Sequence, residues 1–172
     1  MLFDKFKQVK AFVFDVDGVL SDGNILVTEQ GDQLRSFHIK DGYAMQLAIK
    51  RGYPMAVITG GRSAGVKKRM EGLGIADVFL SVSDKSAVLR EWLSFRQLTY
   101  RDILYMGDDI PDLGNMKVAG FATCPADAVE EIKAISAYVS FCKGGQGAAR
   151  DVIEKVKKLQ GTWHEDPEVA SI

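Results

Sequence analysis

The chain has 172 residues, 47% of them hydrophobic, which is enough for one well-buried domain and too little for two independent ones. Its formal net charge of −1 provides no overall basic surface, so nucleic acid is not expected as a partner. No run approaches the ~18 apolar residues of a membrane span, and the first ten residues do not resemble a signal peptide. The two cysteines, Cys124 and Cys142, lack metal-binding spacing and are expected to be packed thiols. We therefore expect a cytoplasmic protein without membrane contact.

Short apolar stretches rich in Val, Ile and Phe recur along the chain and alternate with amphipathic stretches. The stretches that we expect to form strands are 11–14, 55–58, 78–80, 103–106 and 120–122. Helical periodicity is found at 43–51, 64–72, 85–95, 112–117, 126–134 and 148–159. Within the third of these helices, Trp92 and Phe95 are expected to be core residues. Continuous apolar strands that alternate with helices predict a Rossmann-like α/β fold, in which a parallel sheet has helices on both faces.

The segment 24–39 interrupts this alternation directly after the first strand. Two short stretches typical of strands flank the turn Gln30-Gly31-Asp32, and they predict a small β-hairpin insertion. A hairpin beside an active site can serve as a cap or as an assembly surface, whereas elsewhere it is a surface flap. We expect one domain over 1–160, with the hairpin inserted in it, followed by a loose C-terminal tail over 161–172.

Polar residues stand where the predicted strands end. These residues are Asp15 and Asp17 after the first strand, Thr59 with Gly60 and Gly61 after the second, Lys85 after the third, and Asp108, Asp109 and Asp112 after the fourth. The carboxyl ends of parallel strands meet at one edge of the sheet, where ligands of such folds bind. A single strand-end Asp is more often a helix cap than a catalytic group. Because four strand ends agree, we expect these side chains to share one active site.

Several carboxylates in a small cleft repel one another strongly unless a cation lies between them. Oxygen ligands without a convergent His or Cys favour a hard ion, and Mg²⁺ suits a site that also receives a phosphate. Phosphoryl transfer needs a nucleophile, positive charge around the phosphate and a proton donor for the leaving alcohol. Asp15 can act as the nucleophile and Asp17 as the acid and base. Thr59, the backbone of Gly60 and Gly61, and Lys85 can hold the phosphate.

These residues, in this order, resemble the four motifs of the haloacid dehalogenase superfamily: Asp15-Val16-Asp17-Gly18-Val19, Thr59, Lys85, and Gly107-Asp108-Asp109 with Asp112. The resemblance implies that Asp15 is the nucleophile, that Asp17 is the acid/base, and that Thr59 and Lys85 bind the phosphate. It also implies that Asp15, Asp108 and the backbone carbonyl of Asp17 bind Mg²⁺. Asp109 and Asp112 are expected to act through water or by orienting Lys85.

Within that superfamily the chain resembles the Kdo 8-phosphate phosphatases, which act on an acidic eight-carbon sugar phosphate on the way to lipopolysaccharide. The residues that carry this resemblance are the hairpin, the phrases Val19-Leu20-Ser21-Asp22-Gly23 and Lys40-Asp41-Gly42, and Gly144-Gly145-Gln146-Gly147-Ala148-Ala149-Arg150. The resemblance implies a capless homotetramer that assembles through the hairpins. It also implies that Arg150, or the glycines before it, lies near the sugar carboxylate; a solvated Arg150 is the alternative.

The chain departs from this family at Gly61, where relatives commonly carry a basic residue. Arg62 follows one position later and is a second candidate for binding the substrate. Relatives that act on sialic-type nine-carbon sugar phosphates vary in the same region, so a nine-carbon 9-phosphate is an alternative substrate. A further alternative is a phosphatase-like oligomerisation module without activity, but such a module has no reason to keep mutually repelling carboxylates at one sheet edge.

Overall fold

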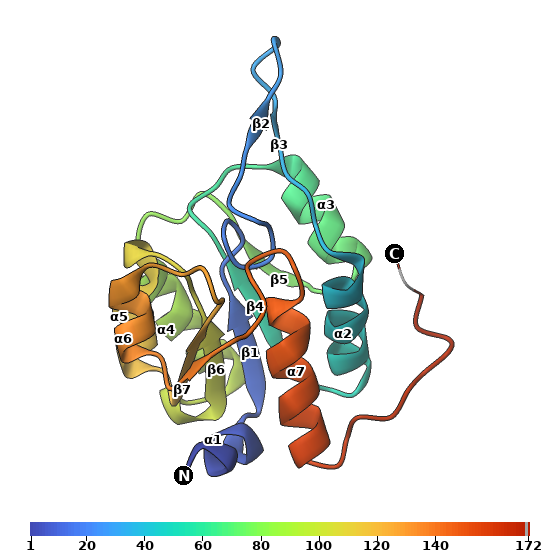
Figure 1. Ribbon diagram of the computed structural model, residues 1–172, viewed down its shortest axis with the longest axis vertical. Helices are drawn as coiled ribbons and strands as arrows, with labels where there is room; N and C mark the ends of the chain where they lie inside the picture. Colours follow the sequence, from blue (N-terminus) through green and yellow to red (C-terminus); the bar gives the residue numbers. More distant parts are fainter. Residues whose placement is uncertain (171) are drawn as a thin grey trace.

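The computed structural model describes residues 1–170 and 172. Six parallel strands form the central sheet, in the order β5-β4-β1-β6-β7-β8. Their bounds are β1 Ala11–Phe14, β4 Met55–Ile58, β5 Asp77–Phe79, β6 Ile103–Met106, β7 Phe121–Cys124 and β8 Tyr138–Val139. The predicted α/β fold is confirmed, and helices lie on both sides of this sheet (Figure 1).

Two groups of helices cover the two faces of the sheet. The first group is α1 Leu2–Gln8, α2 Ile39–Lys50, α3 Ala64–Gly72 and α7 Ala148–Leu159, and the second is α4 Lys85–Arg96, α5 Leu113–Val118 and α6 Glu130–Ile135. Short 3-10 turns, η1 Tyr100–Asp102 and η2 Ile110–Asp112, precede β6 and α5. The four central strands of the sheet are therefore buried throughout, which explains why their sequences are continuously apolar, whereas the edge strands β5 and β8 are only partly covered.

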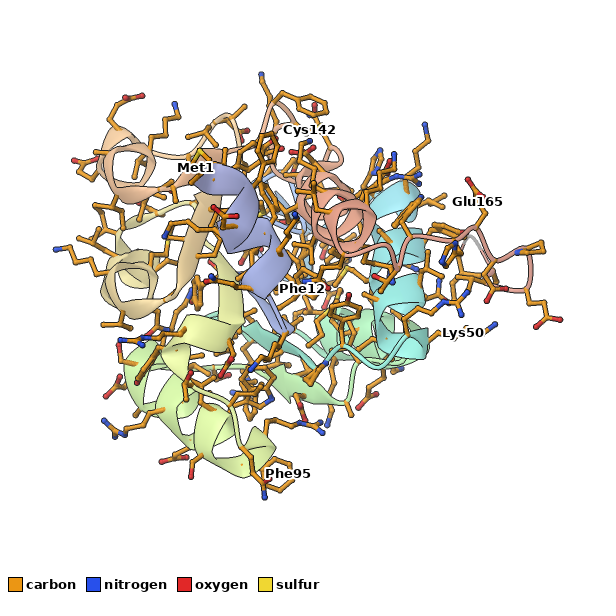
Figure 2. The ribbon with its side chains drawn as sticks, turned by 90° about the horizontal axis from the view of Figure 1, so that it is seen from below. Met1, Phe12, Lys50, Phe95, Cys142 and Glu165 are labelled. Carbon is orange, nitrogen blue, oxygen red and sulfur yellow. The ribbon has the colours of Figure 1, made fainter. Side chains whose placement is uncertain are left out.

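Strand β1 shows how the two faces are filled. Phe12 and Phe14 pack into the core beneath the α2 side, while Ala11 and Val13 pack into the core beneath the α4 side. This alternation is the period of two that a strand imposes on its side chains. On α4, Trp92 is buried as predicted, but the prediction for Phe95 is wrong because its side chain is 76% exposed and points away from the protein (Figure 2).

The hairpin insertion is confirmed, with shorter strands than the sequence suggested. It consists of β2 Leu26–Val27 and β3 Gln33–Leu34, which pair antiparallel. Helix α2 begins at Ile39, so the Lys40-Asp41-Gly42 phrase lies in its first turn. In Figure 1 the hairpin projects from the edge of the sheet where the strands end, so it is placed to contribute to a site there.

The C-terminal tail runs beside α2 (Figure 1). The Lys50 ammonium lies 2.8 Å from the Asp166 carboxylate, and the Gln46 amide donates a hydrogen bond of 2.8 Å to the Ala170 carbonyl. These contacts are near the protein surface, and the looseness of the tail stays a prediction. Among the described residues, every helix falls short of the length and apolar content needed to cross a membrane.

Candidate active site

The structure brings the strand-end residues together in one cavity. Strands β4, β1 and β6 are neighbours in the sheet, so their carboxyl ends lie side by side. The cavity beyond them has a volume of about 540 Å³. It is lined by Asp15, Asp17, Gly23, Thr59, Gly60, Gly61, Val82, Ser83, Lys85, Asp108, Asp109 and Pro111. All the predicted site residues from β1, β4, β6 and the start of α4 line this cavity except Asp112, which lies beneath it.

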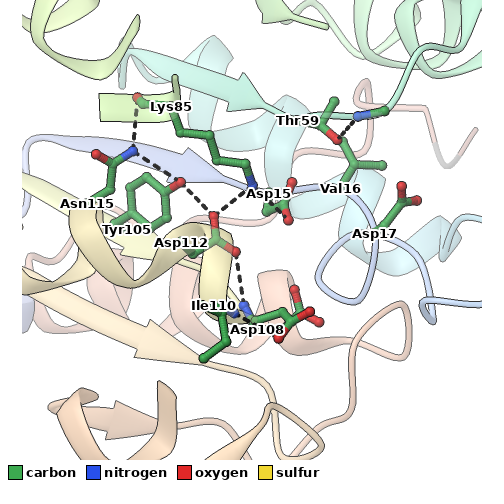
Figure 3. A network of polar contacts seen from close by, with 12 residues as sticks. Asp15, Val16, Asp17, Thr59, Lys85, Tyr105, Asp108, Ile110, Asp112 and Asn115 are labelled. Atoms are coloured by element: carbon green, nitrogen blue, oxygen red, sulfur yellow. Dashed lines mark hydrogen bonds and ion pairs between the residues drawn. The ribbon is translucent and has the colours of Figure 1, made fainter. Parts of the chain in front are cut away.

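Asp112 and Lys85 form the buried base of the cavity (Figure 3). The Lys85 ammonium lies 2.8 Å from Asp112 Oδ1 and 3.1 Å from Asp15 Oδ2. The Tyr105 hydroxyl donates to the same Asp112 oxygen over 2.9 Å, and the Asn115 amide donates to the Lys85 carbonyl over 3.0 Å. Asp112 Oδ1 accepts hydrogen bonds from both Lys85 and Tyr105. The Asp112 carboxylate therefore holds the Lys85 ammonium beside Asp15.

Lys85 keeps its positive charge despite its burial. Burial by itself would lower its pKa, but the charges of Asp15 and Asp112 outweigh that effect, and the pKa is raised. The ammonium is therefore a fixed cation on the floor of the cavity. The full positive charge of the Lys85 ammonium would attract a phosphate that entered the cavity.

Asp15 and Asp108 are the two carboxylates of the site whose buried negative charge is not fully balanced by cations or hydrogen-bond donors. Asp15 Oδ1 and Asp108 Oδ1 are buried, and neither has a hydrogen-bond partner among the described residues. Burial, followed by repulsion from Asp112, raises the pKa of Asp15 to about 7, and the same two causes raise the pKa of Asp108 to about 7. Buried oxygens without partners, held close together, are what a cation would satisfy.

The donor set fits a hard divalent ion. One oxygen from each of Asp15, Asp108 and Asp112 lies within 4.8 Å of the others. All the donors are carboxylate oxygens, which Mg²⁺ prefers. Asp112 is the weakest candidate of the three, because Lys85 and Tyr105 already occupy its Oδ1 and the Asp108 backbone N–H donates to its Oδ2 over 3.3 Å. The free oxygens therefore belong to Asp15 and Asp108.

Gly18 allows the Asp108 carboxylate to approach the β1 loop. A Cβ atom at Gly18 would lie 1.9 Å from Asp108 Oδ2, and the Gly18 φ of +87° is one that other residues rarely adopt. The glycine-rich segment supports this loop from behind, since a Cβ at Gly144 would lie 1.9 Å from the Gly18 carbonyl oxygen. The position of these glycines is thus explained by close packing around the loop that carries Asp15 and Asp17.

Asp17 is held by a residue that none of the sequence motifs includes. Arg35, which follows β3 of the hairpin, donates from Nε to Asp17 Oδ1 over 2.6 Å and from Nη2 to Asp17 Oδ2 over 3.1 Å. The hydrogen bond to Asp17 is the main cause of a raised Arg35 pKa. A lone arginine in a hairpin gives no signal in the sequence, because only the folded chain shows that Arg35 lies against Asp17.

Thr59 and Gly61 lie on the opposite wall of the cavity from Asp108. The Thr59 side chain is buried, and its hydroxyl accepts a hydrogen bond of 3.1 Å from the Gly61 backbone N–H. Asp109 is at the mouth, where its carboxylate accepts from the Ile110 N–H over 2.8 Å and caps the turn η2. Arg62 lines a neighbouring cavity between the hairpin and α3, so it is close to the catalytic cavity without entering it.

Arg150 lies elsewhere in this chain. Its guanidinium is 3.0 Å from Glu154 and is placed between the rings of Tyr43 and Trp163, at 5.8 and 5.6 Å from their centroids. Its backbone N–H donates to Asp41, which caps the start of α7. Within one chain, Arg150 is therefore not brought to the catalytic carboxylates, and its contact with substrate stays a prediction.

The chain is similar to known proteins in both sequence and fold. No family model matches the chain. The chain is 34% identical to the 3-deoxy-D-manno-octulosonate 8-phosphate phosphatase KdsC of Yersinia pestis over 158 aligned residues. This alignment covers 90% of this chain and 84% of that protein. The crystal structure of the phosphatase of that name from Yersinia pestis has a TM-score of 0.91 at 32% identity, over 94% of this chain and 87% of that chain. A Moraxella catarrhalis phosphatase of the same name was crystallised with a magnesium ion, a phosphate ion and KDO. Its structure has a TM-score of 0.90 at 35% identity, over 93% of this chain and 92% of that chain.

Proposed function

This chain belongs to the 3-deoxy-D-manno-octulosonate (Kdo) 8-phosphate phosphatase family of the haloacid dehalogenase superfamily, and we propose that it hydrolyses Kdo 8-phosphate to Kdo and inorganic phosphate. The chain is a phosphomonoester hydrolase. The observation that carries the proposal is the pair of unpartnered oxygens on Asp15 and Asp108 beside the Lys85 ammonium. That arrangement suits a reaction in which a carboxylate must approach a phosphate of the same charge.

In the first step, an oxygen of Asp15 attacks the phosphorus atom, and the bond from phosphorus to the sugar oxygen breaks. The phosphoryl group is then joined to Asp15 as an aspartyl phosphate. Asp17 gives its proton to the departing sugar oxygen, which leaves as an alcohol. Lys85 and Thr59 hold the equatorial oxygens of the phosphoryl group during the transfer, when negative charge is spread over them.

In the second step, water hydrolyses the aspartyl phosphate. Asp17, now ionised, takes a proton from the water, and the water oxygen attacks the phosphorus atom. The bond from phosphorus to Asp15 breaks, so the carboxylate and inorganic phosphate are restored. Asp112 takes no proton in either step, and its part is to hold Lys85 in place over 2.8 Å.

Mg²⁺ is the cofactor that the donor set supports. The carboxylates of Asp15 and Asp108 and the backbone carbonyl of Asp17 would hold it. Asp112 would position Lys85 from beneath the cavity, and Asp109, at its mouth, would act through water. When bound, the ion neutralises charge between Asp15 and the phosphate oxygens. The magnesium ion in the related Moraxella catarrhalis crystal structure supports this choice.

We also propose that the chain works as a homotetramer assembled through the hairpin. Four hairpin residues expose large apolar side chains: Ile25, Leu26, Val27 and Leu34. Apolar side chains gathered on a projecting two-stranded element are typical of a protein interface. Sedimentation of the wild-type chain beside Leu26→Asp tests this, because the charged variant should dissociate into smaller species. A wild-type chain that sediments as a monomer would contradict the proposed assembly.

Turnover of a panel of sugar phosphates tests the substrate. We expect Mg²⁺-dependent phosphate release to be fastest from Kdo 8-phosphate, and EDTA to abolish it reversibly. The panel includes the nine-carbon alternative because Gly61 stands where relatives commonly carry a basic residue. Faster release from a sialic-type 9-phosphate would replace Kdo 8-phosphate as the substrate without changing the chemistry at Asp15.

A further inference from the structure

The contact between Arg35 and Asp17 is incompatible with the work proposed for Asp17. Both oxygens of the Asp17 carboxylate are bound to the Arg35 guanidinium, at 2.6 and 3.1 Å. An acid/base group must direct one of its oxygens at the leaving sugar oxygen or at water. While Arg35 is paired with it, Asp17 is ionised and has no proton to give, and its carboxylate points away from Asp15 (Figure 3). The contact must therefore open during each catalytic cycle.

Arg35 stands at the boundary of two cavities. Asp17 and Gly61 line the catalytic cavity of about 540 Å³. Arg35 lines a second cavity of about 690 Å³ between the hairpin and α3, together with Arg62 and Arg69. The Arg35 side chain is only 4% exposed, so it is enclosed at this boundary and is not a freely moving surface group.

Gly61 provides the room that Arg35 occupies. A Cβ atom at Gly61 would lie 3.3 Å from Arg35 Nη2 and 3.3 Å from Asp17 Oδ2, which is closer than ordinary van der Waals contact. A side chain at this position would require Arg35 or Asp17 to shift by a few tenths of an ångström. In this chain, therefore, the positive charge beside Thr59 comes from the hairpin, because the residue that follows Gly60 has no side chain.

We infer that Arg35 is the specificity-determining residue for the carboxylate of the substrate, and that binding of this carboxylate releases Asp17. A planar guanidinium binds any carboxylate in the same two-point geometry, so the Asp17 carboxylate marks where the substrate carboxylate binds. When the substrate takes over Arg35, Asp17 is free to turn toward the leaving oxygen. A sugar phosphate without a carboxylate leaves Asp17 held, and it is hydrolysed slowly. This inference rests on the proposed action on an acidic sugar phosphate.

The exchange has a simple charge balance. Before binding, Arg35 carries one positive charge and is paired with the Asp17 carboxylate; after binding, it is paired with the substrate carboxylate, and the released Asp17 takes up from solvent the proton that it gives to the leaving oxygen. Arg62 and Arg69, on the far side of Arg35, add positive charge that favours the arrival of an anionic sugar. The only acidic residue that lines this second cavity is Asp32, within the part of the chain that the structure describes.

The test compares two phosphate esters on wild-type enzyme and Arg35→Gln. Kdo 8-phosphate carries a carboxylate, and D-arabinose 5-phosphate is an alkyl phosphate of the same kind without one. For Kdo 8-phosphate we expect kcat/KM to fall about 10- to 100-fold in the variant, as for the loss of a charged hydrogen-bonded partner. For D-arabinose 5-phosphate we expect kcat/KM to rise, because Asp17 is no longer held.

Two further variants control the comparison. Arg35→Lys keeps the charge but loses the two-point geometry, and its ratio of kcat/KM values should lie between those of wild type and Arg35→Gln. Arg90→Gln removes an exposed arginine on α4 and should leave both values unchanged. Thermal melts of all four proteins identify any variant that does not fold, and for such a variant Arg35→Lys decides the outcome.

The inference is supported if Arg35→Gln lowers the preference for Kdo 8-phosphate at least about tenfold without slowing D-arabinose 5-phosphate. It is overturned if the preference is unchanged, or if both substrates slow together, because Arg35 then serves only Asp17. Failure of the proposed function looks different: the wild-type enzyme would then release no phosphate from either compound. If the enzyme prefers a nine-carbon acidic sugar phosphate, the same comparison is made with that substrate.

Discussion

The two edges of the sheet both contain buried ionisable groups, but they hold them in different ways. At the carboxyl edge, Asp15 and Asp108 open onto a cavity, and each has an oxygen without a partner among the described residues. At the opposite edge, Lys157 on α7 is 0% exposed, and its ammonium has no hydrogen-bond partner in the described part of the chain. It lies 5.0 Å from the centre of the Tyr53 ring.

All three groups have a pKa moved toward neutrality. Burial raises the pKa of Asp15 and Asp108 to about 7, and burial, with a smaller effect of Arg51, lowers the pKa of Lys157 to about 8. A shifted pKa alone therefore does not identify an active site. The carboxyl edge is distinguished by several like charges around one cavity with a cation at its base, whereas Lys157 is a single enclosed charge. The following substitutions test this distinction.

Asp15→Asn should have the largest effect. Removal of the nucleophile should lower phosphate release by at least about 10³-fold while the fold is kept, because an amide cannot form the aspartyl phosphate. Phosphate release and circular dichroism measure the two properties. Asp4→Asn, an exposed carboxylate on α1, is the matched control and should behave as wild type. Normal turnover by Asp15→Asn would show that Asp15 is not the nucleophile.

Gly18→Ala should reduce activity by about 10²-fold, because its Cβ would displace the Asp108 carboxylate. The matched control is Gly52→Ala at the other edge of the sheet. Gly52 has φ +84°, close to the +87° of Gly18, but apart from its chain neighbours no described residue has an atom within 4 Å of its Cβ position. Both variants should lose about 1 kcal/mol or more of stability from backbone strain. Equal activities in the two variants would show that strain alone, and not contact with Asp108, is responsible.

Magnesium should stabilise the protein more at higher pH. The pKa of Asp15 and Asp108 is about 7 in the folded chain, against an ordinary value of 3.8 for an aspartate, so the folded state binds protons that the unfolded state has lost. Without metal, stability from these groups is complete below about pH 4 and is lost as the pH rises through about 7. Mg²⁺ competes with those protons, so its thermal shift should be on the order of 5 °C at about pH 8 and smaller at about pH 5.5. Equal shifts measured by differential scanning fluorimetry would argue against these two ligands.

Lys157→Met should have the smallest effect, and it should be a gain. Removal of an enclosed charge should raise the free energy of unfolding by about 1–2 kcal/mol at neutral pH. The folded pKa of about 8 lies below the ordinary lysine value of 10.5, so the cost of the charge is complete below pH 8 and disappears as the pH rises to about 10.5. Activity should not change.

Urea denaturation across this pH range measures the gain. Lys158→Met, which removes an exposed neighbour paired with Glu154, is the control and should change stability by less than about 0.5 kcal/mol. If Lys157→Met is less stable than wild type, the contact of the ammonium with the Tyr53 ring outweighs the cost of burial. The buried Lys157 charge would then stabilise the fold, and the contrast with the unbalanced charges at the carboxyl edge would have to be revised.

Most of the fold and the centre of the site could be predicted from the chain alone. Continuous apolar strands have a length that local composition reveals. Asp15, Thr59 and Lys85 each stand directly at an element boundary, and Asp108 lies one residue beyond the position that follows β6. Elements with weak local signals were missed: β8 has two residues, and α1 buries only Phe6. Phe95 was wrongly assigned to the core because helical spacing does not show where the covered face of a helix ends.

The sequence by itself determined the class of chemistry, because the order of the carboxylates, the threonine and the lysine at strand ends is a local property of each element. Only the tertiary structure decided how these groups are held. Asp112 and Tyr105 clamp Lys85 beneath the cavity, Gly18 admits Asp108, and Arg35 returns from the hairpin to Asp17. These contacts join residues whose separation along the chain carries no information about their distance in space.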